Sequence, residues 1–364
     1  MQGKAFRWTV VFWVALFWIA MSMTGGYEAG AKETIKIKIG SGHSEAAKWI
    51  YHLKTHYVPE VKKRVSEKTK YNLEISEHYS GSVAKLGETL EATEMGLLDI
   101  GADIIVFEPT KFYLHNWPYF IPFSAADPGA IARISAKLFK QFPVFTDILK
   151  KFNLKLLTAA SAGDSYEMNT NFPLRKTEDM KGHKMAGAGA NLPWISGVGA
   201  VPVQSNLMEA YTSLQTGVYE GWIMTVTAVQ SFKLYEISKY LTYMGFGASS
   251  QLLVYMNLKN FNKLPKEVQK ILVDTAEEWT PKECDYLLEQ REVATKIMKD
   301  AGVTFYELPQ EEKVKWANMM ENLPQKYIKE ATAKGWPGAE IVKAAIKLNE
   351  AEGVKYPRNW LSSK

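Results

Sequence analysis

Strand-like and helix-like patterns alternate along most of this 364-residue chain. Residues 35–40, IKIKIG, switch between apolar and polar at every position, which is typical of a half-buried strand. The next segment carries apolar residues at helical spacing, interrupted at Pro59, and YNLEISEHY and DIGADIIVF have strand character again. This order predicts an α/β fold in which mostly parallel strands are covered by helices.

The second half of the chain shows the same alternation. KLLTAAS begins a second predicted sheet, which continues through the strand KMAGA, the helix LMEAYTSLQTG and the strand EGWIMTV. A long amphipathic run follows from Leu264 to Asp300, and Pro281 within it predicts either two helices or one bent helix. The chain is long enough for two lobes of ordinary domain size.

The first residues have the features of an export signal. Lys4 and Arg7 precede an apolar run over residues 8–21, and residues 29–31, Ala-Gly-Ala, are small enough for a cleavage site. The apolar run is shorter than the roughly twenty residues of a membrane-spanning helix. We therefore expect a signal peptide over residues 1–31 and a periplasmic protein, with an uncleaved membrane anchor as the alternative.

Charge and cysteine content exclude several classes of protein. The formal net charge of +5 is mild, and lysines often stand beside acidic residues, as in KKRVSEKTK, so the basic patch of a nucleic-acid binder is missing. Cys284 is the single cysteine, which excludes an internal disulfide and a cysteine metal cluster. We expect Cys284 to be buried or half-buried in a helix.

No catalytic or cofactor motif is complete. The glycine-rich residues 182–194, GHKMAGAGANLPW, match neither a phosphate loop nor a dinucleotide fingerprint. His52 and His56 have a metal-ligand spacing, but Leu53 stands where a zinc protease would need Glu. GSGHS and SAGDS lack the spacing of a nucleophile elbow. We expect no enzyme, no metal site and no cofactor.

A series of short motifs resembles one family. KLGETLEATEMGLLDIGAD, EDMKGHK, GAVPV, SLQTGVYEGW, LPKEVQK and AGVTFYELPQEE follow one another over roughly residues 35–325. Their order and spacing resemble the DctP-type solute-binding proteins of TRAP (tripartite ATP-independent periplasmic) transporters. The resemblance implies a two-lobed, class II periplasmic-binding-protein-like α/β fold with hinge strands and a long lobe-spanning helix. It also implies closure over a ligand, delivery to a small and a large integral membrane subunit, and a monomer.

The domain organisation follows from combining the predicted sheets with this resemblance. We expect lobe I at residues 32–163 plus 249–287 and lobe II at 164–248 plus 288–330. Residues 331–364 form a predicted C-terminal helical tail, which either makes an additional contact or packs back on the molecule.

The chain departs from the family pattern where the resemblance places ligand contacts. Most of the family has an arginine that grips a substrate carboxylate where this chain has Ala186. A second family arginine corresponds to Tyr166, and a family asparagine to Met224. The favoured ligand is therefore an aromatic or partly apolar organic acid. The alternative is a short dicarboxylate or sulfonate held by other donors, with Trp194 and Trp222 in the core.

The candidate ligand-binding residues come from both predicted lobes. From lobe I we expect Ser41, His43 and Asp103, and from lobe II Tyr166, Ala186, Asn191, Trp194, Asn206, Trp222 and Met224. Two other functions stay open from sequence: a ligand-sensing partner of a membrane signalling receptor, and an exported hydrolase.

Overall fold

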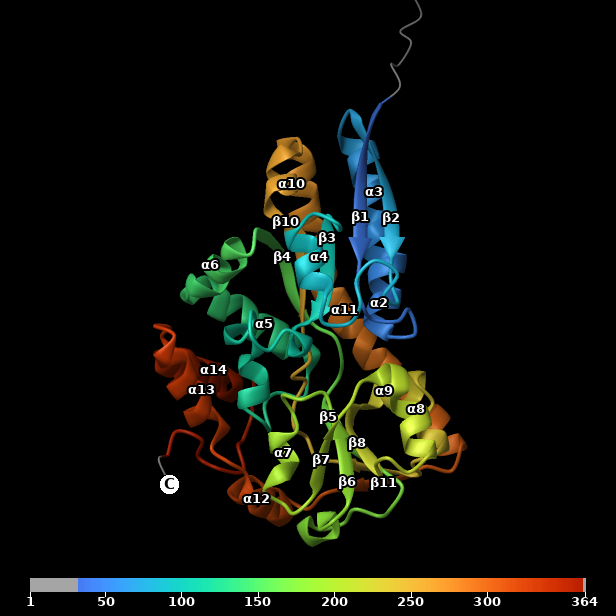
Figure 1. The fold of residues 1–364 in the computed structure, drawn as a ribbon, viewed down its shortest axis with the longest axis vertical. Coiled ribbons are helices and arrows are strands. Elements are labelled where there is room, and N and C mark those ends of the chain that lie inside the picture. The colour runs from blue at the N-terminus through green and yellow to red at the C-terminus, as the bar shows by residue number, and fades with distance from the viewer. Residues whose placement is uncertain (1–31, 363–364) are drawn as a thin grey trace, which may run out of the picture.

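The computed structural model describes residues 32–362, so the predicted signal peptide lies outside the described residues. The chain forms two separate sheets, one in the upper and one in the lower part of Figure 1. The upper sheet has five strands in the order β2-β1-β3-β10-β4. Their bounds are β1 Glu33–Gly40, β2 Tyr71–His78, β3 Ile100–Ile104, β4 Leu154–Ser161 and β10 Gln251–Asn257.

The lower sheet has six strands in the order β11-β9-β5-β8-β6-β7. Their bounds are β5 Tyr166–Thr170, β6 Lys184–Gly187, β7 Val201–Gln204, β8 Gly221–Thr225, β9 Tyr240–Tyr243 and β11 Thr304–Glu307. The predicted parallel order holds for only part of each sheet, because β10 and β5 run antiparallel to their neighbours. Both strands come directly after a crossing between the sheets, over residues 162–165 and 244–250, which reverses their direction relative to the rest.

Helices cover both sheets, and one of them is shared. The bounds are α2 Lys48–His52, α3 Val58–Lys68, α4 Thr89–Glu94, α5 Pro128–Gln141, α6 Val144–Lys151, α7 Pro193–Ser196, α8 Leu207–Gln215, α9 Val226–Ser231, α10 Leu258–Lys263, α11 Lys266–Asp300, α12 Gln310–Met319, α13 Leu323–Ala333 and α14 Gly338–Ala351. A π-helical turn, η1 Leu53–Tyr57, joins α2 to α3, and short 3-10 turns are η2 Ile105–Phe107, η3 Leu114–Phe120, η4 Thr177–Met180 and η5 Leu234–Glu236. None of the helices between residues 32 and 362 is both long and apolar enough to cross a membrane.

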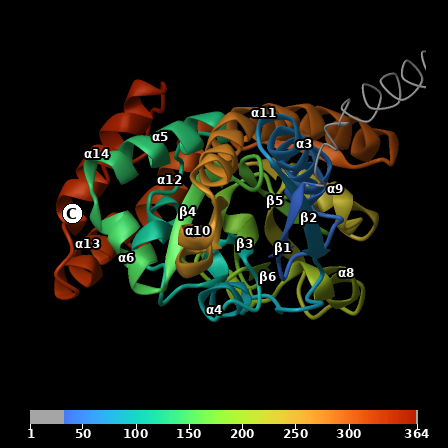
Figure 2. The same ribbon diagram turned by 90° about the horizontal axis from the view of Figure 1, so that it is seen from above.

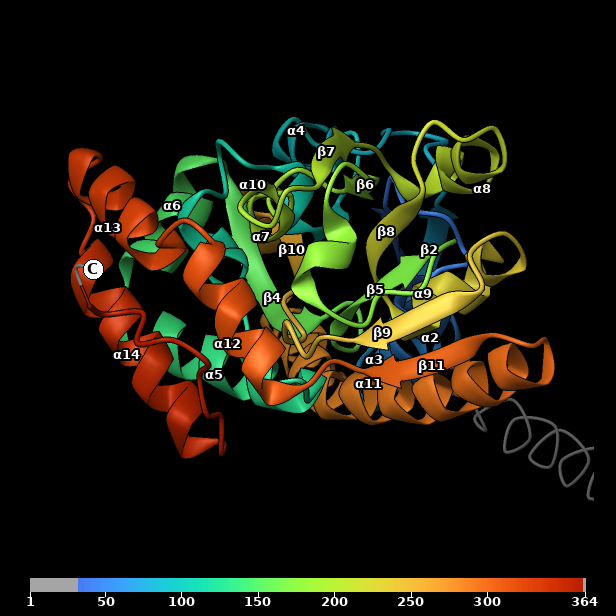
Figure 3. The same cartoon turned by 90° about the horizontal axis from the view of Figure 1, so that it is seen from below.

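The long helix α11 connects the two parts of the molecule. It continues through Pro281 as one helix, so of the two forms predicted around this proline the undivided one is found. Its first half packs in the core of the upper sheet with Leu272 and Trp279, and its second half packs in the core of the lower sheet with Ala294 and Met298. Figures 2 and 3 show α11 running along one side of both sheets. Cys284 is buried in this helix, as predicted.

The C-terminal segment packs back on the molecule. Helix α14 contacts α13 and α5, and the three lie together at one side of the molecule in Figure 3. The side chain of Asn349 on α14 is buried and accepts a hydrogen bond from the backbone N–H of Ala125 at 2.9 Å. Trp360, after α14, is buried in the largest apolar cluster. Of the two possibilities for the predicted tail, packing back is the one found.

Candidate functional site

A cleft of about 820 Å³, including its opening to solvent, lies between elements of the two sheets. Its upper wall is formed by the loop and helix after β1 and by the segment after β3, and its lower wall by β8, α9, the start of α8 and the loop after β6. Helices α2 and α9 contact each other across it. Small-molecule sites are typically concave and lined mainly by apolar and aromatic side chains with a few polar groups, and this cleft has such a lining. Its lining residues are Gly42, His43, Ser44, Ala47, Lys48, Trp49, Leu86, Ile104, Val106, Phe107, Ala162, Tyr166, Ala188, Asn191, Asn206, Leu207, Met208, Trp222, Ile223, Met224, Thr225, Thr227, Ala228, Ser231, Phe232 and Ser250.

The loop after β1 is held against the chain around Leu86. A Cβ atom at Gly42 would lie 2.5 Å from the backbone nitrogen of Leu86, so only glycine allows this close approach. The N–H of Gly42 also donates to the hydroxyl of Thr89 at 3.1 Å. Together these contacts place the next residue, His43, in the cleft wall.

Aromatic side chains form much of the cleft surface. Trp49 and Phe107 pack edge-on against the ring of His43, with ring centroids 5.1 and 5.3 Å away. Trp222 and Phe232 line the opposite wall. Such walls favour a ligand that has an apolar or aromatic body.

Four buried polar atoms on the cleft-lining residues have no hydrogen-bond partner anywhere in residues 32–362. They are Nε2 of His43, Nδ2 of Asn191, Nε1 of Trp222 and Oγ of Ser231. Asn191 is oriented by its other amide atom, Oδ1, which accepts from the N–H of Ala188 at 2.9 Å. Leaving a buried polar group unpaired costs about 1–3 kcal/mol. Because His43 lies on the upper wall and the other three lie on the lower wall, a ligand that bonds to these atoms connects both sides of the cleft.

The imidazole of His43 in the cleft wall is uncharged near neutral pH. Burial lowers the pKa of its imidazole from 6.5 to about 3. Its Nδ1 lies 3.4 Å from the hydroxyl of Ser41 and 3.6 Å from Oδ1 of Asp103. Burial, with the nearby charge of Glu108, raises the pKa of the Asp103 carboxyl well above its usual value. Ser41 and Asp103 thus support His43 from behind rather than line the cleft.

The charge state of His43 leads to a pH prediction. Unfolded His43 takes up a proton near pH 6.5, whereas the folded residue does so only near pH 3. Stability should therefore fall as the pH drops below about 6.5, by up to about 1.4 kcal/mol per pH unit from this residue. The His43→Gln variant should show a shallower loss than wild type in chemical unfolding at about pH 7 and about pH 4.5. Equal pH dependence in both proteins would contradict an uncharged, buried His43.

The structure brings six of the ten predicted site residues to the cleft: His43, Tyr166, Asn191, Asn206, Trp222 and Met224. The hydroxyl of Tyr166 is already engaged, because it accepts from Ser250 at 2.7 Å and lies 2.9 Å from the hydroxyl of Tyr119. The other four, Ser41, Asp103, Ala186 and Trp194, are buried and do not line the cleft.

Ala186 lies on β6 directly beside Trp222 on β8. The two residues are partners in adjacent strands and share one apolar cluster, so their side chains are on the same face. The indole of Trp222 therefore occupies space beside Ala186 that a longer side chain would need. The small residue Ala186 and the large ring of Trp222 thus pack side by side on adjacent strands.

Trp194 belongs to the core. Its indole N–H donates to the backbone carbonyl of Tyr119 at 2.9 Å, and its own carbonyl accepts from the indole of Trp316 at 2.7 Å. Its ring centroid lies 5.1 Å from that of Phe246. All its polar groups are thus used within the protein.

Several cleft residues were missed by sequence reasoning. Lys48 and Trp49 begin α2, Phe107 ends the segment after β3, and Thr227 and Ser231 lie on α9. The only local signal was the helix start after GSGHS, which places Lys48 and Trp49 next to the strand end at β1. The positions on α9 could not be found from spacing, because they reach the cleft through the packing of the two sheets.

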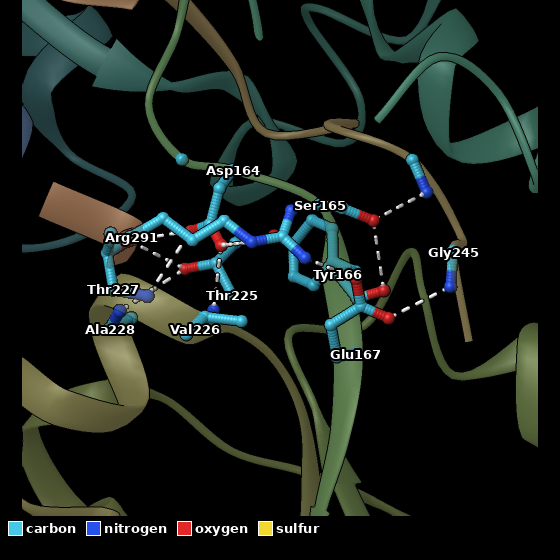
Figure 4. A network of polar contacts seen from close by, with 12 residues as sticks. Asp164, Ser165, Tyr166, Glu167, Thr225, Val226, Thr227, Ala228, Gly245 and Arg291 are labelled. Carbon is cyan, nitrogen blue, oxygen red and sulfur yellow. Dashed lines mark hydrogen bonds and ion pairs between the residues drawn. The ribbon is translucent and has the colours of Figure 1, made fainter. Parts of the chain in front are cut away.

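A polar network lies behind α9 and connects both crossings to α11. The buried carboxylate of Asp164 accepts from the N–H and hydroxyl of Thr227 at 3.3 and 2.8 Å. Arg291 of α11 lies 3.7 Å from Asp164 and 3.6 Å from the buried carboxylate of Glu167, which accepts from the N–H of Gly245 at 2.9 Å. Figure 4 shows Arg291 between the two carboxylates. Burial raises the pKa of Glu167 to about 7, although Arg291 and the backbone donors oppose this.

A comparison with solved structures shows that the whole fold is similar to that of TRAP solute-binding proteins. A solved TRAP solute-binding protein from a marine metagenome, described as specific for aromatic acid ligands and solved with metahydroxyphenylacetate, superposes with a TM-score of 0.76 at 21% identity. The superposition covers 87% of this chain and 99% of that one. At this identity the likeness shows the fold, which is two-lobed and α/β as predicted.

Proteins of similar sequence are also solute-binding proteins. A solute-binding protein of Sulfitobacter sp. (strain NAS-14.1) is 29% identical over 44% of this chain, and that match spans only 48% of the relative. The C4-dicarboxylate-binding periplasmic protein DctP of Rhodobacter capsulatus is 27% identical over 73% of this chain and 77% of its own length. The model of the DctP family, "Bacterial extracellular solute-binding protein, family 7", matches residues 43–330. The resemblance seen in the motifs is thereby confirmed, and the chain belongs to the DctP family of extracytoplasmic solute-binding proteins of TRAP transporters.

Proposed function

We propose that this protein captures a small organic acid with an aromatic or otherwise apolar body and delivers it to the small and large membrane subunits of a TRAP transporter. It does so in the periplasm, as a monomer, without changing the ligand chemically. The observation that carries the proposal is the set of four unpaired polar atoms on opposite walls of an aromatic cleft.

The cleft geometry suggests how binding is coupled to closure. His43 lies on the wall formed by the upper sheet, and Asn191, Trp222 and Ser231 lie on the wall formed by the lower sheet. A ligand can bond to both sets only when the walls are close together, so binding shifts the population toward the closed form. The crossings at residues 162–165 and 244–250 are the hinge in this proposal, with lobe boundaries at 163/164 and 248/249.

The choice of ligand class follows from the cleft walls. Trp222 fills the space beside Ala186, and no arginine is among the described residues that line the cleft. A dicarboxylate would bring two charges to walls that are largely apolar, which is unfavourable. The marine relative of this fold, described as specific for aromatic acids, supports the same class.

A ligand screen tests the proposal. The purified protein is heated with benzoate, phenylacetate, succinate, a sulfonate and the uncharged amides of the acids. A ligand present at about a hundred times its dissociation constant stabilises the folded state by about 2.7 kcal/mol, which raises the melting temperature measurably. We expect aromatic acids to raise it and succinate to leave it nearly unchanged.

The same samples distinguish binding from catalysis. After incubation, the aromatic acid should be recovered unchanged by chromatography, in stoichiometric amount. Turnover would contradict a pure binding role, and a large shift with succinate alone would contradict the proposed ligand class.

A further inference from the structure

The cleft walls carry one full charge. Of the lining residues, Lys48 alone has a charged side chain, and none is Asp, Glu or Arg. His43 adds no charge near neutral pH, because burial lowers its pKa to about 3. Lys48 is therefore the one cationic side chain among the described cleft-lining residues that can pair with an anionic ligand.

Lys48 has no competing partner. Its neighbour Lys54 pairs with Glu45 at 2.7 Å, but no ion pair or hydrogen bond engages the Lys48 ammonium within residues 32–362. Lys48 is half-buried at the first position of α2, the helix that contacts α9 across the cleft. An unpaired ammonium beside apolar walls attracts an anion more strongly than one in bulk water, because the effective dielectric constant is lower.

We propose that Lys48 binds the carboxylate of the ligand and selects an apolar monoanion over a dicarboxylate. This inference rests on the proposed function and names the residue and the ligand charge. In this proposal the ligand carboxylate binds to the wall of the upper sheet. The arginine expected from the family resemblance corresponds instead to Ala186, on the lower sheet.

Charge balance gives the selectivity. One carboxylate of the ligand is neutralised by Lys48, and its oxygens can accept further bonds from the unpaired donors. A second carboxylate would be left among aromatic side chains and neutral donors only, where an unpaired charge is strongly disfavoured. A lysine ammonium also lacks the planar fork of an arginine, so it fixes the position of the carboxylate less rigidly.

Paired ligands and matched variants test this. Dissociation constants of benzoate and benzamide, and of phenylacetate and its amide, are measured by calorimetry with wild type, Lys48→Met, Lys48→Arg and the control Lys62→Met. Lys62 lies exposed on α3 and does not line the cleft. We expect Lys48→Met to weaken acid binding by about 10- to 100-fold and to leave amide binding within about twofold.

The expected results for the other variants and for added salt follow from the same charge interaction between Lys48 and the ligand carboxylate. Lys48→Arg should keep the preference for acid over amide, Lys62→Met should behave like wild type, and added salt should weaken acid binding in wild type more than in Lys48→Met. An unchanged ratio of acid to amide affinity in Lys48→Met would overturn the role of Lys48 while leaving the proposed function intact. Tighter binding of succinate than of benzoate by wild type would overturn monoanion selection. Binding of no acid at all would instead overturn the proposed function.

Discussion

Replacing Asp164 with alanine is expected to lower the free energy of unfolding by about 3–5 kcal/mol. Asp164 is fully buried, accepts hydrogen bonds from the N–H groups of Val226 and Thr227 and from the Thr227 hydroxyl, and lies 3.7 Å from Arg291. The substitution leaves these donors unpaired and removes a countercharge from Arg291. Chemical unfolding followed by circular dichroism measures the change.

A matched control separates this effect from an ordinary surface ion pair. Asp300 on the same helix, α11, pairs with Lys296 at 2.6 Å, but both side chains are largely exposed. Asp300→Ala should therefore cost only about 0.3–0.5 kcal/mol. A double-mutant cycle of Asp164→Ala with Arg291→Met should also show coupling, because the two side chains share one network. A loss at Asp164 no larger than that at Asp300 would contradict the role given to the network.

Weaker ligand binding should accompany the loss of Asp164. Helix α9 begins at Val226 and carries Thr227, Ala228 and Ser231 into the cleft wall. Since Asp164 holds the first turn of α9 in place, its removal disturbs these three residues together. Measured on the folded fraction, affinity for the best acid should fall as well.

The second large effect is expected for Trp194→Ala, which should lower the free energy of unfolding by about 3–5 kcal/mol. The indole is fully buried, packs against Phe246 and donates to the carbonyl of Tyr119. Because Trp194 does not line the cleft, the milder Trp194→Phe should lose stability but bind the ligand as wild type does. Unfolding and calorimetric titration of the same samples measure both properties.

Trp222, unlike Trp194, is expected to contribute to ligand affinity. Its indole nitrogen is buried at the cleft without a partner among the described residues. Trp222→Phe removes that donor and also leaves a cavity in the buried cluster around Trp222, so stability should fall and, unlike in Trp194→Phe, affinity should fall as well, by about 2- to 10-fold. If Trp194→Phe lost affinity and Trp222→Phe did not, Trp194 would be the ligand contact and the proposed site would be wrong.

The fold class was predictable because its signals are local or ordered along the chain. The period of apolar residues marks strands such as residues 35–40 and the long helix up to Asp300. The succession of family motifs over roughly residues 35–325 agrees with the family match over 43–330. The antiparallel insertion of β5 and β10 was not predicted, since strand direction depends on where the chain crosses between sheets.

The candidate site was predictable only in part. His43 and Asn191 follow predicted strands and Trp222 lies within one, and the structure places all three in the cleft. Lys48 and Ser231 reach it because α2 and α9 meet across the cleft, which no local spacing records.

By itself, the sequence determined the elements and the family, because periodicity and the order of motifs are properties of the chain alone. Only the tertiary structure decided which side chains share a space. It placed Trp222 beside Ala186, gave the indole of Trp194 a core partner at Tyr119, and left Lys48 as the one charged residue of the cleft wall in the described chain. These outcomes depend on strand pairing and on the packing of one sheet against the other, and both are interactions between residues far apart in sequence.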